Sequence, residues 1–429
     1  MRILVVGGGG REHALCWALH RDIPEATLFA APGNPGTATL GTNLPIAATA
    51  VDDLVRTAAD QRIDLVVVGP EAPLAAGLVD RLRAAGRAAF GPTRAAARLE
   101  WSKAFAKDVM LKAGVPTAAS RTFNRFADAR RHIMAFHCER IVVKASGLAA
   151  GKGVIVSDTR EDAERAAREM LEGDAFGDAG REIIVEELLE GEELSVMALT
   201  DGEQIAILPP AQDHKRLLEG DAGPNTGGMG AYCPVSLTTP ALLARVRREV
   251  LEPVLWEMRA RDTVYEGVLY AGLMIAPDGT PKVLEFNCRL GDPEAQVILP
   301  LLPRGTLTDA VAIARGDWRP AANVIAPTGS AVTTVLAARG YPEKPELGAA
   351  LTLPEDLGPD VLVFQAGTAR GEGGTLCVAG GRVLAVTALG RSVADAAQKS
   401  AAACARIEFT GKTFRRDIGW REIARAGAA

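Results

Sequence analysis

A stretch rich in glycine and lysine limits most strongly how this chain can fold. Residues 142–156 read VVKASGLAAGKGVIV, with β-branched runs at both ends and three glycines and two lysines between them. The two runs predict paired strands, and the loop between them is longer than the two to five residues that a hairpin needs. Glycines let backbone N–H groups approach a phosphate, and Lys144 and Lys152 add positive charge. The loop therefore favours phosphate binding over a plain basic surface turn.

The spacing within this loop excludes a P-loop. That motif has four residues between the first glycine and the Gly-Lys pair, then Ser or Thr, and then a helix. Here three residues separate Gly147 from Gly151, Gly153 follows Lys152, and a strand comes next. A phosphate loop between two strands is a flap that can close over a nucleotide.

Length and composition describe a globular protein with several domains. A chain of 429 residues is too long for one core, so we expect two to four domains. The formal net charge of −5 argues against a general nucleic-acid or anionic-membrane binder, and no apolar run approaches a membrane span. The six scattered cysteines form no C-x-x-C pair, which disfavours a zinc site or a disulfide framework and favours a reducing cytoplasm. The N-terminal MRILVVGGGG reads as a buried strand rather than a signal peptide.

The first hundred residues alternate strand and helix, which predicts an open parallel sheet. Each predicted strand ends in a glycine-bearing loop, and ligands of open α/β sheets bind at the carboxyl ends of strands. We therefore expect the three loops to line one crevice. The predicted strands are 3–6, 27–30 and 64–68, the helices are 11–20 and 74–85, and the loops are 7–10, 32–36 and 69–71.

The first of these loops also permits a dinucleotide-binding interpretation. Gly7 and Gly9 match the start of G-x-G-x-x-G, but Glu12 occupies the third glycine position, and no acidic residue follows the second strand. Binding of a substrate phosphate needs only the N–H groups and the helix dipole. NAD binding therefore remains the minority interpretation.

The middle of the chain supplies further candidates for nucleotide contacts. A helix beginning near Leu99 and ending near Gly114 carries Lys103 and Lys107 one turn apart, as solvated surface lysines often are. A strand from Ile183 turns acidic, and its Glu186, with Glu193 beyond a glycine turn, could serve the adenine and ribose of a nucleotide or be plain surface acids. A long glycine-rich loop is predicted over 212–234, and it carries Asp213, His214, Lys215 and Asn225.

The second strong signal is a predicted hairpin over 265–302, whose turn is Pro277-Asp278-Gly279-Thr280. Because side chains alternate along a strand, Leu284, Phe286 and Cys288 should face a core, and Glu285, Asn287 and Arg289 the other side. Polar side chains in a row indicate either an exposed face or a binding site. Carboxylate and amide oxygens suit Mg²⁺, so with the flap in the same chain we favour a metal–nucleotide site.

The last hundred residues predict an α+β domain with little chemistry of its own. We expect Ala379-Gly380-Gly381 to connect two paired strands. The predicted strands are 331–337, 360–364, 375–378 and 383–386, and the predicted helix is 393–406.

Taken together, these motifs resemble the ATP-grasp enzymes, and within them the phosphoribosylamine–glycine ligase (glycinamide ribonucleotide synthetase) family. The resemblance covers nearly the whole chain. NTGGMGAY and RDIGW are its most specific motifs, whereas the flap and EFNCR are shared with other ATP-grasp ligases. The motifs are GGGGREHAL at 7–15, PGNPGT at 32–37, VGPEAPLAAGLVD at 68–80, SKAFAKD at 102–108, KASGLAAGKGV at 144–154, DHKR and PNTGGMGAY within 213–232, EFNCRLGDPE at 285–294, and FRRDIGWR at 414–421.

This resemblance implies a three-domain α/β and α+β architecture. It comprises an N-terminal open parallel-sheet (pre-ATP-grasp) domain at 1–101, a two-lobed ATP-grasp domain at 102–325 with its flap lobe at about 118–190, and a C-terminal mixed α+β domain at 326–429. It also implies a purine-biosynthesis reaction. Glycine, ATP and 5-phosphoribosylamine would give glycinamide ribonucleotide, ADP and phosphate through glycyl phosphate, with Mg²⁺ or Mn²⁺ as cofactor.

The resemblance also assigns roles to individual residues. Contacts to ATP are implied for Lys103, Lys144, Gly147, Lys152, Gly153, Glu186, the backbone of Leu188, and Glu193. The metal ligands would be Glu285 and Asn287. Lys144, Lys152, Asp213 and Arg289 are the catalytic candidates, and substrate contacts are implied for Gly8, Gly9, Asn34, Glu71, Asp213, Asn225 and Arg289. The sequence departs from the family pattern at four positions, where we expect other residues. These positions are Trp101, Ser146, Arg339 and Gln365.

Three other functions compete with this one. Another ATP-grasp carboxylate–amine ligase would share the flap and the predicted strand that carries Glu285 and Asn287. An NAD-dependent oxidoreductase would bind its cofactor through residues 7–10. A non-catalytic regulator would bind ATP without turnover. For the favoured function we expect a cytoplasmic monomer whose partners are small molecules, with no nucleic acid and no membrane.

Overall fold

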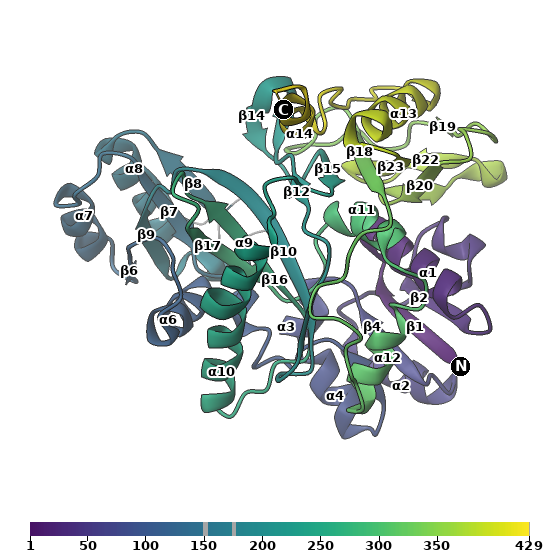
Figure 1. The fold of residues 1–429 in the computed structure, drawn as a ribbon, viewed down its shortest axis with the longest axis horizontal. Coiled ribbons are helices and arrows are strands. Elements are labelled where there is room, and N and C mark those ends of the chain that lie inside the picture. Colours follow the sequence, from purple (N-terminus) through teal and green to yellow (C-terminus); the bar gives the residue numbers. More distant parts are fainter. Residues whose placement is uncertain (149–152, 174–176, 429) are drawn as a thin grey trace.

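The computed structural model describes residues 1–148, 153–173 and 177–428. Four sheets of four or five strands organise this part of the chain. Figure 1 shows the flap lobe projecting at the left, while the N-terminal and C-terminal parts lie together at the right. Among the described residues, no helix combines the length and apolar character that crossing a bilayer requires.

The N-terminal sheet is parallel throughout, as the alternation of strand and helix predicts. Its strand order is β3-β2-β1-β4-β5, and apolar side chains cover both faces, because Leu4 and Val6 belong to one core and Ile3 and Val5 to another. The elements are β1 Arg2–Gly7, α1 Gly10–Asp22, β2 Thr27–Pro32, β3 Thr42–Asn43, α2 Val51–Asp60, β4 Leu65–Val68, α3 Glu71–Ala75, α4 Leu78–Ala84 and β5 Ala88–Phe90.

One helix of this domain differs from the prediction. The expected helix over 74–85 is divided into α3 and α4, because Gly77 between them adopts a φ of 85°. This left-handed conformation suits glycine and cannot continue a right-handed helix. Helix α3 itself begins at Glu71, the last residue of the third strand-end loop.

The flap lobe is a four-stranded sheet with its own core, covered by two helices. Strands β7 and β8 pair antiparallel, with Lys144 opposite Val154, so the predicted hairpin is confirmed at both of its ends. Lys152 lies outside the described residues. The elements are β6 Ser120–Phe123, α7 Phe126–Met134, β7 Ile141–Ala145, β8 Val154–Ser157, α8 Arg160–Glu172 and β9 Ile183–Glu187, in the strand order β6-β9-β7-β8.

The second lobe of the ATP-grasp region is built on the antiparallel sheet β11-β10-β16-β17. The predicted hairpin is β16–β17, but a bulge between Gly272 and Leu273 breaks the expected alternation. Val283 and Phe286 are buried in the core, whereas Leu284, expected to face the core, lines a cavity with Glu285. The elements are α5 Arg98–Trp101, α6 Lys103–Ala113, β10 Glu192–Thr200, β11 Ile205–Ile207, α9 Pro240–Val246, α10 Glu252–Ala260, β16 Gly267–Ile275, β17 Pro281–Asn287, α11 Glu294–Leu301 and α12 Thr308–Arg315.

The segment 212–234 is not the structureless loop that its composition predicts. It contains four short strands, and two of them extend the C-terminal sheet, whose order is β12-β15-β18-β23-β20. Composition did not reveal β15 because its partner β18 lies about a hundred residues further along the chain, and β12 in turn pairs with β15. The strands are β12 Gln212–Asp213, β13 Arg216–Leu218, β14 Ala222–Asn225 and β15 Gly230–Cys233.

In the C-terminal part, the predicted helix coincides with α13 Val393–Arg406, but one predicted strand pair is wrong. The turn Ala379-Gly380-Gly381 joins β22 to β23, yet β22 pairs with β21, and β23 lies between β18 and β20. The remaining elements are β18 Ser330–Ala337, β19 Leu351–Thr352, β20 Val361–Gln365, β21 Thr368–Arg370, β22 Leu376–Val378, β23 Arg382–Gly390, β24 Glu408–Phe409 and α14 Trp420–Ala428.

Candidate active site

A cavity of about 400 Å³ lies where the flap lobe, the β16–β17 hairpin and the two terminal parts of the chain meet. Each of these regions supplies charged side chains to its wall. The charged residues are Arg11, Glu71, Glu100, Lys103, Lys107, Lys144, Asp213, Lys215, Glu285, Arg289, Asp292, Glu294 and Arg382.

Two lysines converge on one buried carboxylate at the flap side of this cavity. Lys107 on α6 lies 2.8 Å from Glu186 on β9, and Lys144 on β7 forms a second ion pair with the same carboxylate. Burial works to raise the pKa of Glu186, but the two ammonium groups hold it below its usual value. Lys144 also donates to the carbonyl of Leu284, 3.2 Å away on β17. These contacts fix Lys144 as a cation on the cavity wall.

The start of α6 is joined to the flap loop. Ser102 caps the helix, the backbone N–H of Lys103 donates to the Ser146 carbonyl at 2.8 Å, and that of Ala104 donates to the Ser146 hydroxyl at 3.1 Å. The Nζ of Lys103 lies 3.4 Å from the carbonyl of Gly147. Gly153, at the other end of the loop, lines the cavity. A helix N-terminus and a lysine therefore face the loop that the sequence assigns to phosphate.

Glu285 on β17 is the cavity carboxylate best placed for a metal ion. Within the described residues it takes part in no ion pair, although Lys215, Lys103 and Lys144 outweigh its burial and lower its pKa. Asn287 lies two residues further along and accepts a hydrogen bond from Arg289 at 2.9 Å. A carboxylate oxygen without a protein partner and a neighbouring amide oxygen fit Mg²⁺ or Mn²⁺, which share hard oxygen ligands with phosphates and water.

Arg289 lies just beyond the end of β17 and links this strand to the N-terminal domain. It lies 2.8 Å from Glu100 and 3.4 Å from Glu71, and these carboxylates overcome burial to raise its pKa. Glu100 also accepts from the backbone N–H of Cys288 at 2.7 Å. A guanidinium held between acids at a cavity wall can present its remaining N–H groups to a carboxylate or phosphate ligand.

Asp213 and Lys215 also line the cavity and lie two residues apart at the start of the 212–233 segment. Lys215 pairs with Glu193 on β10 at 2.5 Å. Burial raises the pKa of Asp213 to about 7, with Glu294 and Glu193 adding to the rise and Lys215 opposing it. A carboxylate that titrates near neutral pH can accept or return a proton during a reaction.

The FRRDIGWR motif at 414–421 holds this segment in place. Arg415, fully buried, pairs with Asp221 at 2.9 Å and with Asp417 at 2.7 Å. His214 accepts from the backbone N–H of Gly419 at 3.0 Å, and burial lowers its pKa, which favours the neutral imidazole. The C-terminal motif thus fixes His214, which lies between Asp213 and Lys215, and Asp221 beyond them, and it does not itself line the cavity.

Several predicted site residues do not line the cavity. Asn34 is buried in the junction of the first two strand-end loops, where it donates to the carbonyls of Gly8 at 3.0 Å and of Gln365 at 2.7 Å. The first two strand-end loops thus meet each other, but only the third reaches the cavity wall, through Pro70 and Glu71, so the expectation that all three line one crevice does not hold for this cavity. The others absent from the wall are Gly8, Gly9, Gly147, Glu186, Leu188, Glu193 and the exposed Asn225.

The structure also brings in residues that the sequence did not identify. Lys107, which we expect from the sequence to be solvated, is buried. The sequence signal that could have identified it is its position one helical turn from Lys103, which places both lysines on the same face of the helix. Arg382 on β23 lies 3.1 Å from Asp292, so the expectation that the C-terminal part has little chemistry is wrong. No local pattern marks Arg382, because only the tertiary fold brings it to the cavity. Arg11, Glu100 and Glu294 belong to the same group.

Comparisons with known protein families agree with this architecture. Residues 1–100, 101–295 and 331–421 match the N, ATP-grasp (A) and C domains of phosphoribosylglycinamide synthetase. The phosphoribosylamine–glycine ligase of Chlorobaculum tepidum is 46% identical over 428 residues, covering 99% of this chain and all of that protein. The chain belongs to the phosphoribosylamine–glycine ligase family. The family resemblance and the three-domain ATP-grasp fold expected from the motifs are thereby confirmed.

Further relatives and a more distant structural neighbour extend the comparison. The trifunctional purine biosynthetic protein adenosine-3 of Bos taurus is 47% identical over 426 residues, and this chain spans 42% of its length. The crystal structure of the Thermotoga maritima phosphoribosylamine–glycine ligase superposes with a TM-score of 0.87 at 37% identity, covering 97% of this chain and all of that one. A biotin carboxylase from Campylobacter jejuni shares the fold alone, with a TM-score of 0.75 at 15% identity over 97% of this chain and 93% of that one.

Proposed function

We propose that this chain ligates glycine to 5-phosphoribosylamine at the expense of ATP, giving glycinamide ribonucleotide, ADP and phosphate. The observation that carries the proposal is the cavity itself, where Glu285, surrounded by Lys103, Lys144, Lys215 and Arg289, forms no ion pair with any residue that the structure describes. Such a site suits a metal–nucleotide complex together with the carboxylate group of an amino acid. Membership of the family supports the choice of glycine and phosphoribosylamine.

The chemistry requires two displacements. A carboxylate oxygen of glycine attacks the γ-phosphorus of ATP, ADP leaves, and glycyl phosphate forms. The amine nitrogen of phosphoribosylamine then attacks the glycyl carbonyl carbon, phosphate leaves, and the nitrogen loses a proton. Asp213, with its pKa raised to about 7, is placed to accept that proton. No covalent bond to the protein is needed.

The protein positions the reactants and neutralises charge. Lys103, Lys144, Lys152, Gly147 and Gly153 serve the phosphates of ATP. At 4 Å and an effective dielectric near 20, each lysine–phosphate pair contributes roughly 4 kcal/mol before desolvation. Glu285 and Asn287 would hold Mg²⁺ or Mn²⁺, which supplies further charge neutralisation when bound.

The remaining assignments concern the two ends of the cavity. We assign the adenosine end to Glu186, the Leu188 backbone and Glu193, where Glu186 also fixes Lys107 and Lys144 through its ion pairs. Arg289, Glu71 and Asp213 contact the glycine and phosphoribosylamine substrates. Gly8, Gly9, Asn34 and Asn225 are assigned to the phosphoribosylamine end, where Gly8, Gly9 and Asn34 act through the shape of the strand-end loops. We further propose three domains at 1–101, 102–325 and 326–429, and a cytoplasmic monomer that uses only small-molecule partners.

Isotope transfer tests the acyl-phosphate route. With glycine labelled by oxygen-18 in its carboxylate, the bridging oxygen of glycyl phosphate should leave with phosphate, so one labelled oxygen per turnover appears in inorganic phosphate. Mass spectrometry of the released phosphate measures this. Unlabelled phosphate from a complete reaction would contradict the proposed sequence of displacements.

A further inference from the structure

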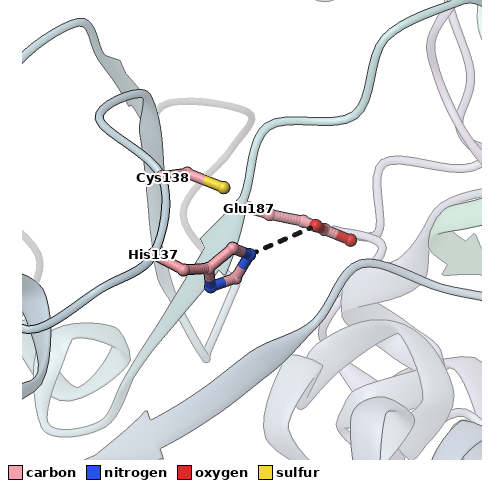
Figure 2. Close-up of side chains that lie close together, drawn as sticks. All are labelled: His137, Cys138 and Glu187. Carbon is pink, nitrogen blue, oxygen red and sulfur yellow. Dashed lines mark ion pairs between the residues drawn. The ribbon is translucent and has the colours of Figure 1, made fainter.

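A histidine, a cysteine and a glutamate meet in the flap lobe, apart from the residues that line the ATP cavity. His137 and Cys138 lie in the connection from α7 to β7, and Glu187 ends β9. Figure 2 shows the imidazole and the thiol directed towards the Glu187 side chain. One donor atom from each residue lies within 4.8 Å of the other two. The sequence did not predict this grouping, because Glu187 is about fifty residues away from the other two.

Two contacts orient the donors. The backbone N–H of Ala119 donates to one carboxylate oxygen of Glu187 at 3.0 Å, and the other oxygen lies 3.9 Å from Nε2 of His137. The His137 ring packs against Phe136, with ring centroids 4.7 Å apart. Cys138 is a half-buried free thiol. The second carboxylate oxygen, the imidazole nitrogen and the sulfur are therefore available to one ligand.

The chemistry of the three donors selects a class of ion. Zn²⁺ binds sulfur at about 2.3 Å and nitrogen or oxygen at about 2.0–2.2 Å in a tetrahedron, whose donors lie roughly 3.3–3.8 Å apart. The donors here would have to close by about 1 Å, which partly exposed side chains can do by rotamer adjustment. Mg²⁺ and Ca²⁺ prefer oxygen ligands, so the thiol and imidazole discriminate against them.

We propose that His137, Cys138 and Glu187 form a binding site for a zinc-class transition-metal ion, with water as the fourth ligand. The site is separate from the metal site proposed at Glu285. Side chains alternate along β9, so Glu186, 3% exposed, faces Lys107 and Lys144, whereas Glu187, 23% exposed, faces the opposite side. A bound ion would cross-link the α7–β7 connection to β9 and stabilise the flap lobe.

Co²⁺ substitution in the full-length chain tests this proposal. In saturating Mg²⁺, which occupies hard oxygen sites, Co²⁺ should give a thiolate-to-cobalt charge-transfer band that titrates to one ion per chain. Zn²⁺ should compete the band away and raise the melting temperature. Cys138→Ser should abolish the band, and His137→Ala and Glu187→Gln should weaken Co²⁺ binding at least about tenfold.

Matched variants separate this site from other thiols and from the cavity. Cys377→Ser removes another half-buried thiol, Glu139→Gln removes an exposed neighbouring carboxylate, and Glu285→Ala removes the cavity ligand. All three should keep the band. Absence of the band in the unmodified protein, or its persistence in Cys138→Ser, would overturn the proposal and leave the ligase assignment unaffected.

Discussion

Two glycine-rich segments border the cavity, and they are held there in contrasting ways. The flap strands β7 and β8 belong to a lobe with its own apolar core, which includes Ile141, Val143 and Ile183. In the 212–233 segment, β12 and β15 join the C-terminal sheet, and the residues between them are held by polar contacts to the C-terminal motif, chiefly those of Arg415 and His214. Similar composition therefore gives a lobe with its own core in one case and a segment that depends on distant strands and ion pairs in the other.

This contrast shows what glycine content does and does not reveal. Glycine permits close backbone approach and tight turns, but neighbouring side chains decide whether a segment is fixed. The flap is bounded by β-branched residues that pair with each other locally. In the 212–233 segment, Ala222–Asn225 are exposed and pair locally with β13, while Asp221 beside them is held by Arg415, about 200 residues away. The first predictions below perturb each segment in turn.

The largest effect is expected at the flap. Lys144→Met removes a phosphate partner and leaves Glu186 paired with Lys107 alone. A loss of roughly 4 kcal/mol corresponds to about a thousandfold fall in kcat/KM, measured by ADP release. Lys112→Met, an exposed lysine on α6, should behave like the unmodified protein. A Lys144→Met enzyme within tenfold of normal would refute the role of this lysine.

Breaking the anchor of the other segment should chiefly affect stability. Arg415→Met leaves the carboxylates of Asp221 and Asp417 without their buried guanidinium, which we expect to lower the free energy of unfolding by about 3 kcal/mol. Urea titration measures this change, and the neighbouring exposed Arg416→Met is the control. Unchanged stability in Arg415→Met would show that the motif does not hold the segment.

A somewhat smaller effect is expected for the proton acceptor on this segment. With its pKa raised to about 7 in the free protein, Asp213 is protonated below that pH, so kcat/KM should fall as the pH decreases through 7. Asp213→Asn should lower kcat about a hundredfold and remove this acid limb from the pH profile. An intact acid limb in the variant would assign the titration to another group.

The smallest effect is expected at the exposed edge of the segment. Asn225 does not line the cavity, although the family resemblance implies a substrate contact for it and our proposal assigns it to the phosphoribosylamine end. Asn225→Ala should change the free energy of unfolding by no more than about 0.5 kcal/mol, as surface substitutions usually do. The KM for phosphoribosylamine distinguishes the two views: an increase of tenfold or more supports direct contact, and an unchanged KM removes Asn225 from the site.

Local patterns predicted those parts of the molecule whose partners are close in sequence. The parallel strands, the flap hairpin and the β16–β17 hairpin follow from short apolar runs and turn residues. The sequence points to Glu285 and Arg289 as binding-site residues, because a row of polar side chains along a strand indicates either an exposed face or a binding site. The bulge that turns Leu284 towards the cavity has no comparable signature in this sequence.

The remaining features depend on contacts between distant parts of the chain. Lys107 becomes a buried partner of Glu186 only because α6 packs against β9, and Arg382 reaches the cavity only through the C-terminal sheet. Asn34 was assigned to substrate, but its amide is used by Gly8 and Gln365. The amide group that suits asparagine to substrate binding suits it equally to joining two domains by hydrogen bonds. Only the folded structure shows which of these contacts Asn34 makes.

The central claim is that the cavity couples ATP cleavage to joining glycine and phosphoribosylamine. ADP release should be measured in the complete mixture with Mg²⁺ and after omitting each component in turn, with Glu285→Ala in parallel. We predict stoichiometric ADP and glycinamide ribonucleotide in the complete mixture, no sustained ADP release without glycine, phosphoribosylamine or Mg²⁺, and no turnover by folded Glu285→Ala. ADP release with a different acid and amine but none with this pair, or full activity of Glu285→Ala, would contradict the account.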